Sequence, residues 1–220
     1  MRNSSVSLAR EGVPFIFLAA FATLVFALLE WEIAACAALA LTVFSVNFFR
    51  DPERVIPSTT HDPLVAVSPA DGKVVKIGRM RDPITGEERT AVCVFMNVFN
   101  VHVNRCAVAG TVERIRYYPG KFLNASFDKA SEDNERCALG IVDAHGGRWT
   151  MVQIAGLIAR RIVCWAEEGD VLGRGQRYGL IRFGSRVDLY LPQDYTPAVG
   201  IGDKVLAGQT ILASKRTAGE

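Results

Sequence analysis

The stretch Arg182-Phe183-Gly184-Ser185-Arg186-Val187-Asp188-Leu189-Tyr190-Leu191-Pro192 places a Gly-Ser pair between a short apolar lead-in and an alternating run of apolar and polar residues. This pattern predicts a strand, a tight turn and a second strand. Gly184 tolerates strained backbone conformations and leaves its carbonyl open to the hydroxyl of Ser185. The pair is therefore either the polar tip of an ordinary hairpin or a point where the chain attacks its own backbone.

Most of the chain beyond residue 70 consists of short runs rich in β-branched residues, separated by Gly and Pro. Such spacing is typical of a barrel or sandwich. A Gly-Asp, four-residue, Gly-Gln pattern occurs at 169–176 and again at 202–209, similar to turns in lipoyl- and biotinyl-like sandwiches. We therefore predict a mainly β, barrel-sandwich-like domain with pseudo-symmetric halves and little helix, at most a turn or two at 155–161. The expected strands are 74–77, 91–95, 110–115, 140–142, 149–154 and 162–165.

Two uncharged runs, Val13–Leu29 and Ile33–Phe49, precede this domain. Glu30-Trp31-Glu32 separates them, and because a carboxylate at the centre of a bilayer costs roughly 3 kcal/mol, the two runs do not merge into one span. They predict an N-terminal hydrophobic helical hairpin, and arginines at its open end place both termini in the cytoplasm. A cleaved signal peptide and a hairpin lying within one leaflet are the alternatives.

The composition divides the chain into a hairpin at 1–50, an extended proline-rich linker at 51–70 and a β domain at 71–220. A net charge of only +2 gives no indication of a nucleic-acid partner. The five cysteines lack CxxC spacing, which predicts free thiols in a reducing compartment and neither a disulfide framework nor a metal site.

Few residues in the β domain suit proton transfer. Of the three histidines, His61 and His145 lie in turn-like surroundings, whereas His102 lies within a β-like run. From its pattern alone, His102 is either structural or a proton carrier. Asp71, in Asp-Gly-Lys, is likewise either a hairpin residue or an acid with a chemical role.

Four motifs, in this order, resemble the short prokaryotic (type A) phosphatidylserine decarboxylases, which depend on a pyruvoyl group. The resemblance extends from about residue 51 to residue 213, and it implies a carboxy-lyase that converts phosphatidylserine to phosphatidylethanolamine and CO2. The motifs are Ser-Pro-Ala-Asp-Gly-Lys-Val (68–74), Phe-Asn-Val-His-Val-Asn-Arg (99–105), the charged segment 124–136 and Gly184-Ser185.

By this resemblance, Asp71 orients His102, and His102 takes the proton of Ser185. Ser185 then attacks the carbonyl of Gly184, and the chain separates into fragments 1–184 and 185–220. Ser185 becomes a covalent pyruvoyl group, the cofactor, which holds the substrate as a Schiff base. The longer bacterial enzymes carry a second histidine where Phe99 stands here, so no role for that histidine is transferred. The resemblance implies no metal.

The charged segment supplies two further candidates, Lys129 and Arg136, whose side chains could pair with the phosphodiester or carboxylate of the substrate. The implied partners are the phospholipid substrate, the membrane and the two fragments held as a heterodimer, and a higher oligomer is also compatible. The implied location is the cell membrane, with the β domain on the cytoplasmic side.

Two other classes of function remain open. Asp128-Lys129-Ala130 is similar to a lipoyl attachment tripeptide, which would indicate a lipoyl- or biotinyl-like carrier, but Lys129 lies in a polar tract rather than between apolar strands. A membrane-anchored hydrolase could use Asp71, His102 and Ser185, but the chain has no Gly-x-Ser-x-Gly elbow. Self-cleavage distinguishes the decarboxylase from both alternatives.

Overall fold

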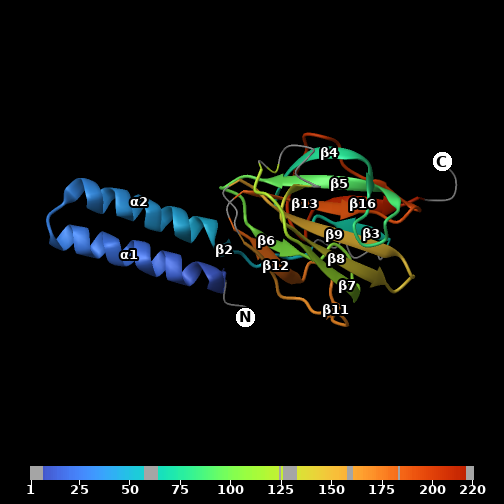
Figure 1. The fold of residues 1–220 in the computed structure, drawn as a ribbon, viewed down its shortest axis with the longest axis horizontal. Coiled ribbons are helices and arrows are strands. Elements are labelled where there is room, and N and C mark those ends of the chain that lie inside the picture. The colour runs from blue at the N-terminus through green and yellow to red at the C-terminus, as the bar shows by residue number, and fades with distance from the viewer. Residues whose placement is uncertain are drawn as a thin grey trace. The chain divides into compact units, whose positions relative to one another are not determined.

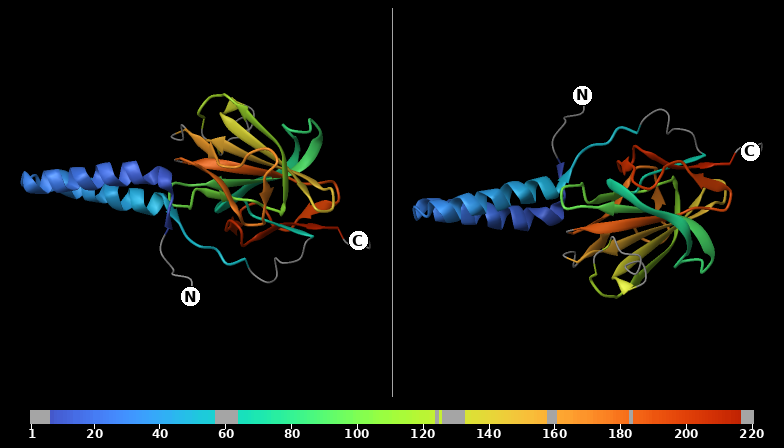
Figure 2. Two further views of the ribbon diagram at one scale, coloured as in Figure 1. Left: turned by 90° about the horizontal axis from the view of Figure 1, so that it is seen from below. Right: turned by 90° about the horizontal axis from the view of Figure 1, so that it is seen from above.

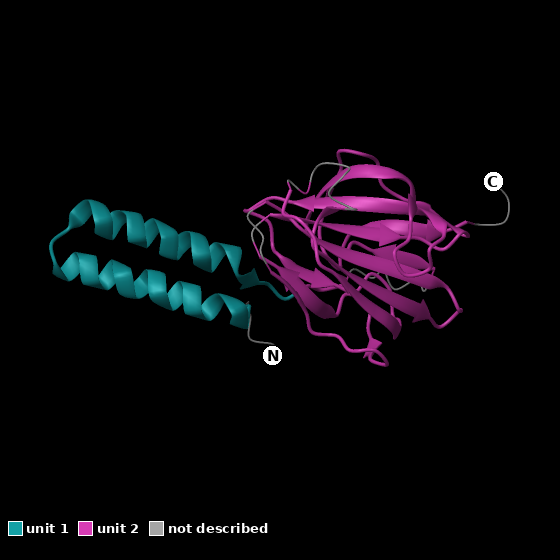
Figure 3. Ribbon diagram, in the orientation of Figure 1, with its two compact units in different colours: residues 1–53 teal, residues 54–220 magenta. Residues whose placement is uncertain are grey.

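The structure is a computed structural model that describes residues 7–56, 64–123, 125, 133–157, 161–182 and 184–216. The chain divides into two compact units, Met1–Glu53 and Arg54–Glu220, which Figure 3 shows in different colours. The first unit contains two long helices and the second is built from strands (Figures 1 and 2).

The first unit is a helical hairpin formed by α1, Val13–Leu28, and α2, Glu32–Phe48. A short turn joins the helices, and Glu30 in that turn adopts a left-handed φ of 59°. The hydroxyl groups of Thr23 and Thr42 lie 3.3 Å apart across the helix pair. The predicted hairpin is thus present. The remaining elements of this unit are η1 (Arg10–Gly12), β1 (Ser7–Leu8) and β2 (Arg50–Asp51).

Many apolar side chains of both helices are exposed on the surface of this unit. Phe17 is 70% exposed and Ile33 is 88% exposed. A helix that is apolar on all sides suits an apolar environment. By length and composition, the continuous helix Arg10–Leu28 could cross a membrane, with a mean hydropathy of 2.0, and α2 is shorter.

The second unit is mainly β, as predicted. An eight-stranded antiparallel sheet curls around its core, and two three-stranded sheets complete it (Figure 1). The large sheet has the order β11 (Val171–Leu172), β7 (Gly110–Tyr118), β8 (Arg136–Asp143), β9 (Arg148–Ala155), β13 (Ser185–Tyr190), β5 (Glu88–Met96), β4 (Gly72–Arg81) and β15 (Lys204–Val205). The small sheets have the orders β10 (Ile162–Cys164), β12 (Arg177–Ile181), β6 (Val103–Arg105), and β14 (Tyr195–Pro197), β16 (Ile211–Lys215), β3 (Val65–Val67).

The strand order is pseudo-symmetric about the boundary between β9 and β13. From one edge the large sheet runs β15-β4-β5-β13, and from the other it runs β11-β7-β8-β9. The two Gly-Asp repeats lead into the edge strands β11 and β15, and their later glycines, Gly175 and Gly208, adopt φ values of 74° and 71°. These two glycines also lie against each other, because a Cβ on Gly208 would be 3.5 Å from Gly175 Cα. The repeated pattern at 169–176 and 202–209 therefore forms equivalent turns in the two pseudo-symmetric halves of the β unit.

β13 occupies the centre of the large sheet, between β5 and β9. All six of its residues are buried, including Arg186 and Asp188. Their side chains form a two-point ion pair, with Nε–Oδ1 at 2.6 Å and Nη2–Oδ2 at 2.7 Å. Such pairing is what makes buried charge tolerable. Burial lowers the pKa of Arg186, but the Asp188 carboxylate together with Cys93 and Tyr190 raises it, so that the net shift is upward.

Three local features differ from the simplest interpretation of the sequence. The strands on either side of Gly184, β12 and β13, belong to different sheets, so the Gly-Ser pair is not a hairpin tip. Val65–Val67, within the expected linker, forms β3 and pairs with β16. At 155–161, Ala155 still belongs to β9, and residues 158–160 lie outside the described part of the chain.

All five cysteines are free; Cys93, Cys106 and Cys137 are buried, Cys164 is half-buried and Cys36 is exposed. Cys137 on β8 and Cys164 on β10 share a thiol–thiol hydrogen bond that lowers the pKa of Cys164. The same bond, together with burial, raises the pKa of Cys137.

Candidate active site

The junction between Gly184 and Ser185 lies where the chain enters the centre of the large sheet. Gly184 has a φ of 69°, in the left-handed region that favours glycine. Ser185 is the first residue of β13 and is fully buried. Its Oγ lies 4.0 Å from the Sδ of Met96, its register partner on β5. The serine hydroxyl is therefore shielded from water and adjoins its own preceding carbonyl.

His102 lies directly against this junction. Its side chain is buried, and its Nε2 lies 3.4 Å from the amide nitrogen of Gly184. Its Nδ1 lies 3.0 Å from the carbonyl oxygen of Asn100. Because a carbonyl oxygen can only accept a hydrogen bond, Nδ1 carries the proton in this arrangement. Nε2 is then the basic nitrogen, and it faces the junction.

Asp71 lies immediately before β4 and does not orient His102 by a hydrogen bond in this structure. Its Oδ2 is 2.7 Å from Nη2 of Arg54, and its Oδ1 accepts the amide hydrogen of Ala207 at 2.8 Å. In the described part of the chain, the imidazole of His102 is not among the hydrogen-bond partners of Asp71. The carbonyl of Asn100 takes the orienting position that the sequence interpretation gave to Asp71.

Two residues that the sequence interpretation did not single out fix the backbone opposite Ser185. Gly156 follows β9, and a Cβ at this position would overlap the carbonyl oxygen of Gly184. Asn134 is fully buried, and its Nδ2 donates to the carbonyl of Ala155 at 2.7 Å and to that of Leu123 at 2.8 Å. Since Ala155 is the register partner of Ser185 on β9, Asn134 braces the backbone across from the serine.

Comparison with known proteins agrees with this geometry. The family model described as phosphatidylserine decarboxylase matches residues 41–213. The chain belongs to the phosphatidylserine decarboxylase family. This confirms the resemblance drawn from the four motifs and, with it, the predicted carboxy-lyase class.

Similar curated proteins in this family cover essentially the whole chain. A phosphatidylserine decarboxylase proenzyme of Nitratidesulfovibrio vulgaris is 61% identical over 219 residues, covering 100% of both chains. Proteins of the same name from Oleidesulfovibrio alaskensis and Solidesulfovibrio magneticus are 61% and 62% identical, covering 98% and 94% of this chain and 98% and 96% of their own.

In this member of the phosphatidylserine decarboxylase family, the structure describes only one of the two expected substrate-binding residues. Lys129 lies outside the described residues. Arg136 pairs with Tyr118 on β7 and with Ile154 on β9, and its guanidinium lies 4.6 Å from the centre of the Tyr118 ring. Ile154 packs with Ala138 and Val152 in a small cluster on the face of the large sheet opposite the core, the outer face. Arg136 therefore points away from the core face that carries Ser185.

A buried polar chain continues from Ser185 into the core. Met96 Sδ, next to Ser185, accepts a hydrogen bond from Nδ2 of Asn104 at 3.7 Å. Oδ1 of Asn104 in turn accepts one from Nε2 of Gln153 at 2.8 Å. Within the described residues, the Oε1 of Gln153 has no hydrogen-bond partner. The chain of contacts that begins at Ser185 therefore ends at an acceptor without a described partner, on the residue of β9 that pairs with Val187.

Replacing Gly156 with alanine tests the close approach at the junction. The added methyl group should displace the Gly184 carbonyl from its position for attack. If this raises the activation free energy by ~1.4 kcal/mol or more, self-cleavage slows by about tenfold or more. The rate is measured by gel electrophoresis of newly synthesised chain. Gly78→Ala is the matched control, since nothing lies within 4 Å of a Cβ at that strand position. Equal rates for both variants, with both proteins folded, would show that the close approach of Gly156 to Gly184 does not affect self-cleavage.

Proposed function

We propose that this chain is a proenzyme that cleaves itself between Gly184 and Ser185 and then decarboxylates phosphatidylserine to phosphatidylethanolamine. The observation that carries the proposal is the position of His102, whose basic Nε2 faces the amide of Gly184 beside the buried serine. The match to the phosphatidylserine decarboxylase family, and to curated relatives named as its proenzymes, favours this reaction over a hydrolase that uses the same residues.

The cleavage uses groups that the chain itself provides. His102 Nε2 accepts the hydroxyl proton of Ser185, and Oγ attacks the Gly184 carbonyl, so an ester replaces the peptide bond. Loss of the α-proton of Ser185 then breaks the Cβ–Oγ bond and releases Gly184 as a carboxylate. The dehydroalanine that remains isomerises to an imine, and water converts it to a pyruvoyl group with release of ammonia.

The site fits a pyruvoyl group at position 185. The group is small and uncharged, and it would occupy the buried start of β13, where the polar chain through Asn104 and Gln153 offers hydrogen-bonding groups. Once formed, the pyruvoyl group supplies a carbonyl that binds the substrate amine and accepts the electron pair as CO2 leaves. We expect His102, whose ring is held by the Asn100 carbonyl, to deliver a proton to the reacting carbon.

The two fragments are expected to remain together as a heterodimer after cleavage. Fragment 185–220 contains β13, β14, β15 and β16. β13 lies between β5 and β9, β15 pairs with β4, and β16 pairs with β3, all of which belong to fragment 1–184. Removing the small fragment would open the large sheet at its centre, so the ladder hydrogen bonds and core burial oppose dissociation.

The preference of the processed enzyme for phosphatidylserine over free serine tests this function. Decarboxylation needs a primary amine on the carbon that bears the carboxylate, and the phosphatidyl group adds binding energy that helps to orient it. We expect processed enzyme to turn over a short-chain phosphatidylserine with a much higher kcat/KM than free serine, measured by CO2 release. Phosphatidylethanolamine lacks the carboxylate and serves as the unreactive control. Equal kcat/KM values for serine and the lipid would contradict the lipid assignment and leave self-cleavage untouched.

The helical hairpin is proposed to hold the enzyme at the cytoplasmic face of the cell membrane, because arginines flank its open end. We expect a chain lacking residues 1–53 to cleave itself and to stay in the supernatant when membranes are sedimented, whereas the full chain sediments. The truncation keeps Arg54, which holds Asp71. A truncated chain that still sediments with membranes would show that the β unit has its own membrane-binding surface.

A further inference from the structure

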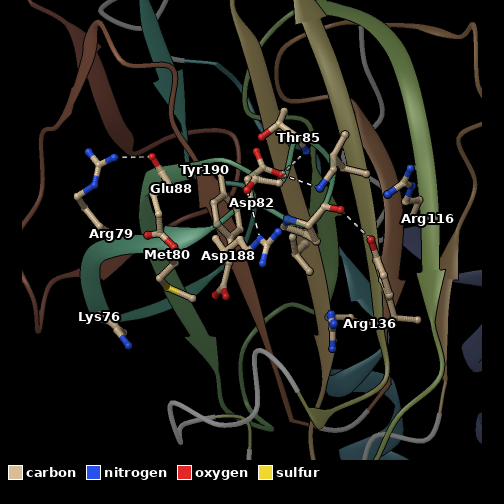
Figure 4. A pocket seen from close by; sticks show the side chains of 16 residues that line it. Lys76, Arg79, Met80, Asp82, Thr85, Glu88, Arg116, Arg136, Asp188 and Tyr190 are labelled. Atoms are coloured by element: carbon tan, nitrogen blue, oxygen red, sulfur yellow. Dashed lines mark hydrogen bonds between the residues drawn. The ribbon is translucent and has the colours of Figure 1, made fainter.

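A cavity of about 910 Å³ lies on the outer face of the large sheet (Figure 4). Asp188 and Tyr190 of β13 line it, whereas Val187 and Leu189 of the same strand belong to the core on the other face. Because side chains alternate along a strand, Ser185 also points to the core face. The cavity is therefore separate from the proposed active site.

The turn between β4 and β5 forms a fixed wall of this cavity. Asp82 in the turn is fully buried and accepts hydrogen bonds from Arg89 and Thr150, each at 2.9 Å. The carbonyl of Pro83 accepts the hydroxyl hydrogen of Tyr118 from β7 at 2.8 Å. Ile84 packs over Gly140 of β8, where a Cβ would lie 3.2 Å from the isoleucine. The turn is thus tied to three other strands, and the cavity is preformed.

Positive charge exceeds negative charge in the lining. The basic residues are Lys76, Arg79, Arg81, Arg116 and Arg136. The acidic residues are Asp82, Glu88 and Asp188, and the first and last of these are already neutralised by Arg89 and Arg186, which do not line the cavity.

Three of these arginines, Arg79, Arg81 and Arg116, keep their charge available. Arg79 and Arg81 donate to the main-chain carbonyls of Glu88 and Gly86, not to carboxylates. For Arg116 the described part of the chain offers no hydrogen bond or ion pair. Figure 4 shows Arg79 and Arg116 on opposite sides of the cavity, with Tyr190 and Asp82 between them. A ligand in this space would meet guanidinium groups from two directions.

The remaining lining is apolar or aromatic and includes Met80, Ile84, Tyr118, Val152 and Tyr190. Ligand pockets in proteins typically measure roughly 300–1000 Å³ and combine such walls with a few polar groups. A guanidinium fork binds a carboxylate or a phosphate at two oxygens, and a phosphate has a further oxygen that a second guanidinium can bind. We propose that this cavity binds an organic phosphate, with the phosphate between the arginines and an apolar body against the sheet.

Calorimetric titration of the full Ser185→Ala chain in neutral detergent with sn-glycerol 3-phosphate tests this site. This proenzyme has no pyruvoyl group, so its binding does not depend on the proposed function. We expect saturable binding that weakens by about tenfold or more in the Arg79→Gln/Arg116→Gln double variant, because each fork contributes charge-assisted hydrogen bonds. Arg148→Gln, which removes an exposed arginine of the same sheet paired with Glu113, is the matched control and should bind normally.

Competition identifies the source of the phosphate. Displacement of glycerol 3-phosphate by mixed micelles containing phosphatidylglycerol, but not by micelles containing phosphatidylcholine, would assign the site to an anionic lipid head group. Failure of both to displace it would assign the site to a soluble phosphate ester. Absence of binding at millimolar glycerol 3-phosphate, or equal affinity in the double variant with its thermal unfolding unchanged, would overturn the proposal.

Discussion

Replacing Ser185 with alanine is expected to leave one intact chain with no measurable decarboxylase activity. The methyl group keeps the size and burial of the serine, but it provides neither the attacking oxygen nor the Cβ–Oγ bond that must break. Intact-mass measurement should find the full chain in the variant. In the unmodified protein it should find fragments 1–184 and 185–220, and the small fragment should resist Edman degradation because its N-terminus is a ketone.

The control for this variant is Ser214→Ala, which makes the same change in β16 of the same fragment, away from the junction. It should cleave normally. A Ser185→Ala chain whose thermal unfolding matches that of the control, and which is nevertheless cleaved or active, would disprove the pyruvoyl mechanism. An active unmodified protein that stays as a single intact chain would do the same.

Much of the site could be predicted because its signals are local. Ser185 follows a glycine at a break between apolar runs, and His102 lies in a β-like run within a motif of recognisable order. The structure brings these two residues to the same junction. The mainly β fold could be predicted equally well, because strands and turns are indicated by patterns that extend over only a few residues.

The residues that were missed owe their roles to contacts between distant segments. Gly156 matters because the register of β9 against β13 sets it beside Gly184. Asn134 matters because it bridges Leu123 and Ala155. Nothing within a few positions of either residue in the sequence specifies these neighbours, although Asn134 does belong to the charged segment that the resemblance marked.

The charged residues of β13 show a second limit. Alternation along 185–191 predicts one buried face, yet Arg186 and Asp188 on the other face are buried as well. They are satisfied by each other, and the β4–β5 turn, tied to Tyr118, builds a wall on the same side of the sheet. A pattern of apolar residues records which face meets the core, and it does not record what covers the opposite face.

Replacing His102 with alanine is expected to make uncleaved chain accumulate, with a cleavage rate lower by about 10²–10⁴-fold, the usual contribution of a positioned general base. Nε2 faces the junction while Nδ1 is held by the Asn100 carbonyl, and alanine carries no nitrogen that could accept the proton. The rate is measured by pulse labelling and gel electrophoresis. Added imidazole should restore part of the rate, which a purely structural role for His102 would not allow.

The Asp71→Asn variant distinguishes a role of Asp71 in proton transfer through His102 from a role in stabilising the fold. In this structure Asp71 binds Arg54 and Ala207, and the imidazole is held without it. We therefore expect this variant to lower the unfolding temperature, because the ion pair with the largely buried Arg54 is lost, and to slow cleavage far less than His102→Ala does. Should Asp71→Asn slow cleavage as strongly as His102→Ala at unchanged stability, the aspartate would act through the histidine, as the family resemblance first implied. Normal cleavage of His102→Ala would instead remove the histidine from the reaction.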